Sequence, residues 1–148
     1  MNIQALTKTH LEACAEIFID TYNSPPWNYQ WNLEGAIKYL SEYLSSADFA
    51  GFVLYDNEEI AGAILAHSKT WWTNKQLYID ELFIAPKAQK KGFGNNLINH
   101  AEKYALDNDL KTITLMTHKF MPSMKFYENN DFIHAQPFVL LFKNVQPD

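Results

Sequence analysis

Hydrophobic residues recur along the chain with two periods, and these periods predict which segments are helices and which are strands. A spacing of three to four residues predicts helices over 9–22, 32–44, 92–105 and 122–129. Extended apolar runs bounded by turn residues predict strands over 3–6, 49–55, 60–66, 77–84 and 112–117, and two closing strands over 132–133 and 138–142. The order predicts a mixed α/β (α+β) domain in which helices cover a central sheet. No linker or repeat interrupts it, so we expect one domain over residues 1–148.

Composition narrows the class of protein. The chain has 148 residues, 47% of them hydrophobic, which is too apolar for a disordered chain. Its formal net charge is -5, and this acidity without a basic run argues against nucleic acid as a partner. All 12 basic residues are lysines. Because arginine is absent, any bound phosphate must be held by backbone amides and lysines.

Single residues and short segments indicate the compartment. Cys14 is the only cysteine and has helical spacing from Leu11 and Phe18, which favours a small buried hydrophobe over a nucleophile. The N-terminus does not resemble a signal peptide, and no apolar run is long enough for a membrane span. The histidines His67, His118 and His134 lack metal-ligand spacing and are interpreted as ordinary residues. We therefore expect a soluble cytoplasmic protein with neither a metal nor a membrane partner.

A glycine-containing loop joins the predicted strand 77–84 to the helix that follows. Residues 89–94 read Gln-Lys-Lys-Gly-Phe-Gly and hold two of the five glycines. Glycine lets a ligand approach the backbone closely, and the N–H groups at a helix N-terminus attract anions. Lys87, Lys90 and Lys91 add positive charge, so the sequence predicts a phosphate or pyrophosphate site. A glycine-capped tight turn with solvated lysines is the structural alternative.

Other phosphate-binding motifs do not match this loop. A P-loop requires Gly-x-x-x-x-Gly-Lys followed by Ser or Thr, which is absent. A dinucleotide-binding loop needs a third glycine, and Leu97 stands at that position.

The predicted strand 77–84 is followed by Pro86, the Gln89-x-x-Gly92-x-Gly94 loop and a long helix. Together these features resemble the acetyl-coenzyme A signature of the GNAT N-acetyltransferase superfamily. The resemblance extends over almost the whole chain, including Lys125-Phe126-Tyr127-Glu128 before Asp131-Phe132. It implies a largely antiparallel sheet with helices on both faces, splayed between the fourth and fifth strands. It also implies acetyl transfer from acetyl-coenzyme A to a primary amine of a small molecule, polyamine, aminoglycoside or peptide.

The resemblance assigns residues to acetyl-coenzyme A as a co-substrate. Loop amides that bind the pyrophosphate correspond to Gln89, Lys90, Lys91, Gly92, Phe93, Gly94 and Asn95. The strand that pairs with the pantetheine arm corresponds to Leu82, Phe83 and Ile84, and an open strand edge suits the amides of that arm. Ser123 stands where the family has alanine and is implied as a further contact. Phe120 and Asp131 replace the family's asparagine and glycine, which leaves the contacts over 120–123 open.

Three residues are implied in catalysis. Tyr127 matches the family tyrosine near the coenzyme sulfur and would protonate the leaving thiolate, although a buried aromatic role is the alternative. Asp80 and Glu81 are adjacent on the predicted strand 77–84, and alternation predicts that they lie on opposite faces. Only one of them would then face the acetyl group. Asp80 is slightly favoured as the base, because it aligns with the glutamate of polyamine-acetylating relatives, and a water is the alternative.

Aromatic residues indicate the acceptor site. The connection between the first two helices carries Trp27, Tyr29 and Trp31, and Trp71 and Trp72 follow later. Together they would form a wall that attracts a cationic amine, but a small core under a long loop is the favoured explanation.

Two other functions stay open at this stage. One is a non-catalytic acyl-coenzyme A-binding or sensing domain of the same fold, and the other is a different nucleotide-binding module. The late strands often mediate dimers in this fold, which adds a homodimer as a further expectation.

Overall fold

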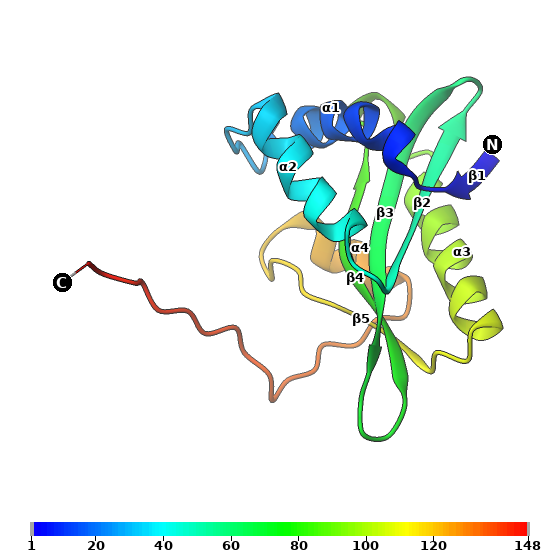
Figure 1. Cartoon of the computed structure of the whole chain (residues 1–148), viewed down its shortest axis with the longest axis vertical. Helices are drawn as coiled ribbons and strands as arrows, with labels where there is room; N and C mark the ends of the chain where they lie inside the picture. Colours follow the sequence, from blue (N-terminus) through cyan, green and yellow to red (C-terminus); the bar gives the residue numbers. More distant parts are fainter. Residues whose placement is uncertain (1, 148) are drawn as a thin grey trace. The chain divides into compact units, whose positions relative to one another are not determined.

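Strands from both halves of the chain pair in sequence order to form one sheet. The computed structural model describes residues 2–147, whose contacts divide into two compact units, 2–117 and 118–147. The first unit holds β1 (Asn2–Ala5), β2 (Phe49–Asp56), β3 (Glu59–Thr70), β4 (Lys75–Ile84) and β5 (Thr112–Leu115), side by side in that order (Figure 1). Strands β1 to β4 pair antiparallel, and β5 pairs with β4 in parallel. The predicted mixed, largely antiparallel sheet is confirmed.

Helices cover both faces of this sheet, as predicted. Two short 3-10 turns, η1 (Lys8–His10) and η2 (Pro86–Ala88), precede helices α1 (Leu11–Tyr22) and α3 (Phe93–Asp107), and α2 (Leu33–Leu44) follows α1. Val53 of β2 packs in one cluster with Phe18 of α1 and Leu40 of α2. The neighbouring Phe52 contacts His100 of α3, with ring centroids 4.4 Å apart. Because successive strand residues face opposite sides, α1 and α2 cover one face and α3 the other.

The second helix begins where the sequence predicts and the first buries its predicted face, but α1 begins at Leu11 after a 3-10 turn and not at residue 9. Asn32 caps α2, its Oδ1 accepting a hydrogen bond of 2.7 Å from Gly35 N. Cys14 of α1 is 1% exposed and lies in the core, where burial raises the pKa of its thiol to about 12. It therefore behaves as the small hydrophobe that its spacing predicts. No helix among residues 2–147 combines the length and the apolar character needed to cross a bilayer.

The fourth strand carries a β-bulge at the point where it separates from its parallel neighbour. Glu81 pairs with Leu65, but the next pair joins Ile79 to Ala66, so Asp80 is an extra residue on β4. The pairing of β4 with β5 also ends at Ile79, opposite Leu115. One edge of β4 pairs with β3, and the other faces β5. From Asp80 onward this other edge is not paired to β5, which is the predicted splay.

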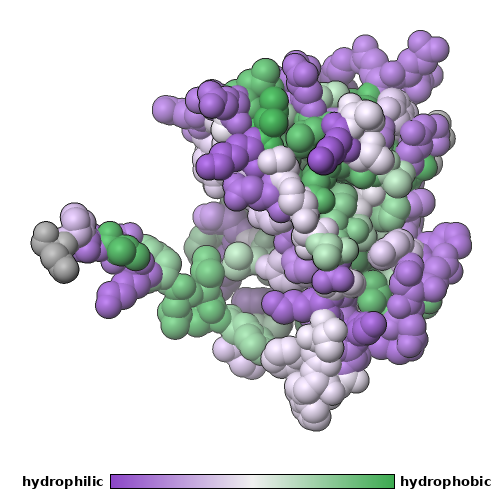
Figure 2. All heavy atoms as spheres, in the orientation of Figure 1, coloured by the Kyte–Doolittle hydropathy of each residue, from purple (hydrophilic) through white to green (hydrophobic). Residues whose placement is uncertain are grey.

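The second unit differs from the sequence-based prediction. Its helix α4 (Pro122–Asn129) is confirmed, but the predicted closing strands at 132–133 and 138–142 are wrong, because the described residues there form no ladder. A strand exists only where its backbone groups pair with those of another strand, and no strand is present among residues 118–147. Residues 138–142 are 71% to 85% exposed, and Figure 2 shows hydrophobic residues in green along part of the projecting C-terminal segment, beside hydrophilic ones in purple.

Candidate active site

The bulge brings the two candidate carboxylates to the same face of the sheet. Glu81 pairs with Leu65, whose side chain packs under α1 and α2. Asp80 Oδ2 lies 2.7 Å from Nδ1 of His67, which stands two residues beyond Leu65 and so on the same face. The expectation that Asp80 and Glu81 face opposite sides is therefore wrong. A bulge interrupts the alternation on which it rested.

Phenol groups from the two covering helices surround Glu81. Tyr39 of α2 donates a hydrogen bond of 2.7 Å to Oε1, and Tyr22 of α1 donates one of 3.4 Å to Oε2. Tyr43 donates in turn to the Tyr39 oxygen at 3.0 Å. Burial raises the pKa of Glu81 to about 7, although the two phenols act in the opposite direction. The carboxyl group is therefore close to half ionised at neutral pH.

The Asp80 carboxylate is held by a histidine that sequence analysis treated as ordinary. Burial raises the pKa of Asp80, and the hydrogen bond to His67 opposes that rise. The His67 ring also packs against Tyr78, with centroids 5.4 Å apart. Two residues that face each other across a hairpin leave no local motif, which is why inspection of single segments missed this pair.

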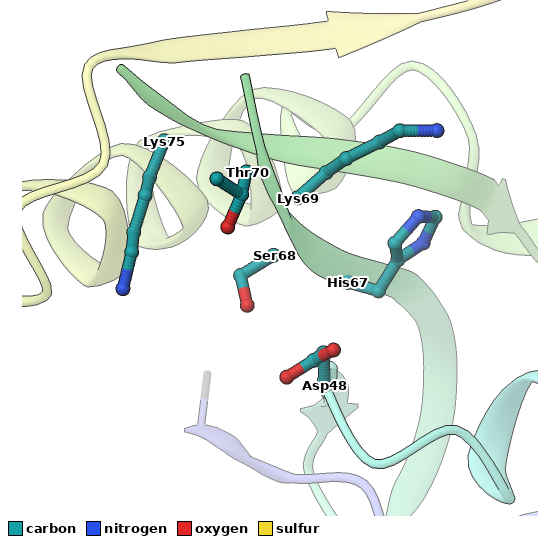
Figure 3. A pocket seen from close by; sticks show the side chains of 6 residues that line it. All are labelled: Asp48, His67, Ser68, Lys69, Thr70 and Lys75. Atoms are coloured by element: carbon teal, nitrogen blue, oxygen red, sulfur yellow. The ribbon is translucent and has the colours of Figure 1, made fainter. Parts of the chain in front are cut away.

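A cavity of about 330 Å³ is lined in part by His67, which pairs with Phe49, the first residue of β2, at the point where the β3–β4 hairpin extends past β2. Figure 3 shows the side chains that line it, which are Asp48, His67, Ser68, Lys69, Thr70 and Lys75. The His67 side chain is 29% exposed, whereas that of Asp80 is 8% exposed. Of the two partners, His67 is the one that a solute can reach.

Part of the aromatic connection between α1 and α2 lies next to the Glu81 site. The Tyr22 ring, which contacts Glu81, lies 5.4 Å from that of Trp27 and 6.2 Å from that of Tyr29. Trp31 instead packs on Phe18, with centroids 5.2 Å apart, in the core under α1 and α2. The connection from Asn28 to Asn32 lines a second hollow of about 560 Å³.

The other two candidate tryptophans lie elsewhere. Trp71 and Trp72 occupy the turn of the β3–β4 hairpin, where they are 53% and 85% exposed. Figure 1 places this turn at the far end of the sheet from the α1–α2 connection. The five aromatic residues therefore do not form a single wall.

The glycine loop presents its backbone in the way the sequence predicts. Gly92 is the N-cap of α3 with a φ of +85°, and the first helical hydrogen bond runs from Asn96 N to Gly92 O. The N–H groups of the first turn, contributed by Phe93 and Gly94 among others, precede that bond and point out of the helix end. A Cβ atom built at Gly92 would have no atom within 4 Å, so the space in front of the loop is open.

Side chains around the loop divide into structural and exposed ones. Gln89 Nε2 donates to Ile84 O at 3.0 Å, which ties the loop to the end of β4. Lys87 forms an ion pair of 2.8 Å with Glu59. Lys90 and Lys91 are exposed, and neither pairs with an acid among residues 2–147. A phosphate group at this loop would meet backbone donors and two unengaged point charges.

The edge of β4 that faces β5 has no strand partner beyond the bulge among the described residues. The carbonyl of Leu82 accepts a hydrogen bond from Tyr22 at 3.4 Å, and that of Ile84 accepts one from Thr21 at 3.2 Å. These donors are side chains and not a neighbouring strand. Phe83, between Leu82 and Ile84, is 2% exposed and belongs to the core under α1 and α2.

Two candidate residues belong to the second unit. Tyr127 and Ser123 lie on α4, and the Tyr127 ring packs between Phe126 and Phe132, with centroids 5.1 and 5.3 Å away. Tyr127 O accepts hydrogen bonds from the N–H groups of Asn130 and Phe132, which end the helix. Phe120, at the position where relatives carry asparagine, is 84% exposed.

The strand with its bulge, the glycine loop and the helix that follows all lie within the segment that one family model matches. The profile of the Acetyltransferase (GNAT) family matches residues 11–132, which span most of the chain. The chain belongs to this family and is an acetyltransferase, which confirms the resemblance found in the sequence.

Individual relatives agree with this assignment. The N-acetyltransferase YhfO of Bacillus subtilis strain 168, itself described as uncharacterized, is 31% identical over 77% of this chain and 78% of its own length. A possible acetyltransferase from Clostridium difficile 630 superimposes with a TM-score of 0.82 at 14% identity, over 98% of each chain. AAC(6')-Iy, solved with the bisubstrate analog CoA-S-monomethyl-acetylneamine, gives a TM-score of 0.75 at 15% identity, over 97% of this chain and 98% of its own.

Proposed function

We propose that the protein transfers an acetyl group from acetyl-coenzyme A to a primary amine by direct attack of the amine on the thioester. One observation carries the proposal. At the point where the pairing of β4 with β5 ends, the bulge sets Asp80 and Glu81 on one face of the sheet, and Tyr22 connects Glu81 to the aromatic residues that follow α1. A thioester at the unpaired edge of β4 and an amine at the aromatic connection would meet beside two carboxylates.

The coenzyme would be bound mainly by backbone groups. Its pyrophosphate fits the amides of Gly92, Phe93 and Gly94 at the start of α3, with Lys90 and Lys91 as point charges. The amides of the pantetheine arm would pair with β4 from Leu82 to Ile84. The Leu82 N–H would stabilise the oxyanion of the tetrahedral intermediate, and Tyr127 would give its proton to the leaving thiolate.

The two carboxylates would have different tasks. Glu81 lies between Tyr39 and Tyr22, and Tyr22 contacts the aromatic residues Trp27 and Tyr29. An ammonium group there would meet a carboxylate and aromatic faces, and its charge would favour ionisation of Glu81. Asp80 would take part in removing the proton of that ammonium, since only a neutral amine attacks the thioester.

The experiment measures release of coenzyme A thiol with a panel of amines that includes diamines, peptides and neamine-type aminoglycosides. Glu81→Gln should raise the KM for the amine about 10-fold or more, and Asp80→Asn should lower kcat about 10- to 100-fold. Glu42→Gln, which changes an exposed glutamate of α2, is the matched control and should leave both constants unchanged. Coenzyme binding without turnover of any amine would refute the enzyme and support an acyl-coenzyme A-binding domain.

The C-terminal segment supports a further expectation, a homodimer. Residues 138–142 are apolar and exposed, and β5 pairs only with β4 among the described strands. An apolar segment and a strand edge on each of two copies would complement one another. Light scattering after gel filtration tests this, and a monomer at micromolar concentration would refute it. The cytoplasmic location stays a prediction from the sequence.

A further inference from the structure

Asp80 is poorly placed to accept a proton from a substrate by itself. Its side chain is 8% exposed, and Oδ2 is already engaged by His67 at 2.7 Å. A general base must come within hydrogen-bond reach of the proton it removes. The 29% exposed His67 side chain, which borders the cavity beside the hairpin, meets that requirement better.

The hydrogen bond to Asp80 also determines which ring nitrogen can act. An ionised carboxylate only accepts hydrogen bonds, so the proton of a neutral His67 ring sits on Nδ1. The lone pair is then on Nε2, which has no hydrogen-bond partner among residues 2–147. Tyr78, packed against the ring, restricts its rotation. The geometry therefore presents one oriented, unoccupied proton acceptor on the face that carries Glu81.

We propose that His67 is the catalytic base of the acetyl transfer and that Asp80 is its positioning residue. This inference rests on the proposed function. His67 Nε2 takes one proton from the substrate ammonium and becomes imidazolium, whose charge Asp80 stabilises. The amine nitrogen, now neutral, forms its bond to the thioester carbon, and the carbon–sulfur bond breaks. The second nitrogen proton leaves as the amide forms, the thiolate acquires a proton, and the imidazolium releases its own to solvent.

Chemical rescue tests the assignment. His67→Ala should lower kcat about 100-fold at pH 7, within the range for loss of a general base. Added imidazole or 4-methylimidazole should restore at least 10-fold of that loss, because removal of the partly exposed ring leaves a space of its own size. His134→Ala, which alters an exposed histidine bonded to Gln136, is the matched control and should neither lose activity nor respond to imidazole.

A second measurement separates a base from a merely structural residue. An amine that is already neutral at pH 7 needs no base to deprotonate it, so its turnover should fall less than 5-fold in His67→Ala. Asp80→Asn should lower kcat with little change in the KM for the amine. Nitrogen NMR of His67 in that variant should show a mixture of the two neutral tautomers in place of the Nδ1-protonated tautomer alone. Equal losses for basic and weakly basic amines, or the absence of rescue in a folded variant, would overturn the assignment.

Failure of the proposed function gives a different result. In that case the wild-type protein turns over no amine at all, and the assignment of His67 as the base is refuted together with the proposed function. An active wild-type enzyme with an unimpaired His67→Ala variant would instead retain the acetyltransferase and reject His67 as its base.

Discussion

Glu81 should make the fold less stable at neutral pH than a neutral side chain would. Its pKa is raised from 4.5 to about 7 by burial, so the folded state favours the protonated carboxyl group. The penalty is absent below pH 4.5, grows as the pH rises toward 7, and is complete above that value. At about 1.4 kcal/mol per pH unit, this difference corresponds to roughly 3 kcal/mol. Glu81→Gln keeps an oxygen that accepts from Tyr39 and removes the ionisation, so the variant should gain up to this amount.

The assay is thermal or urea unfolding of both proteins between pH 5 and pH 8. The stability difference in favour of Glu81→Gln should widen with pH, by a change in Tm on the order of 5 to 10 °C for a chain of this size. Glu59→Gln is the control of opposite sign, because the Lys87 ion pair lowers the pKa of Glu59 and its ionised form is the favoured one. A difference for Glu81→Gln that is flat with pH, or that reverses in sign, would refute the reasoning.

Three further predictions concern binding and catalysis. Gly92→Val should weaken coenzyme A binding, measured by calorimetry, at least 10-fold, because the valine side chain would enter the space before the loop amides. Lys91→Ala should weaken binding less than 3-fold. Equal losses in the two variants would contradict the assignment of pyrophosphate binding to the backbone. Tyr127→Phe should lower kcat 10- to 100-fold with an unchanged Kd for the coenzyme, and an unchanged kcat would exclude it as the acid. Trp27→Ala should raise the KM for cationic amines several-fold, while Trp72→Ala, at the exposed hairpin turn, should not; the reverse order would move the acceptor site to the hairpin.

Elements with strong local signals were predictable from the sequence. The cap at Asn32 and the buried Cys14 follow from spacing and from the chemistry of single residues. The strand predicted over 138–142 failed for the opposite reason. A run of apolar residues favours a strand, but only a partner edge supplies the hydrogen bonds, and a hydrophobic pattern says nothing about the partner.

The candidate site was harder to predict because it depends on one extra residue in a strand. Strand alternation assigns a face to each position only while the register is regular, and the bulge at Asp80 breaks that rule within the segment that carries the catalytic candidates. Without the bulge, Asp80 would face α3 and could not meet His67, and only Glu81 would remain on the side of the aromatic connection.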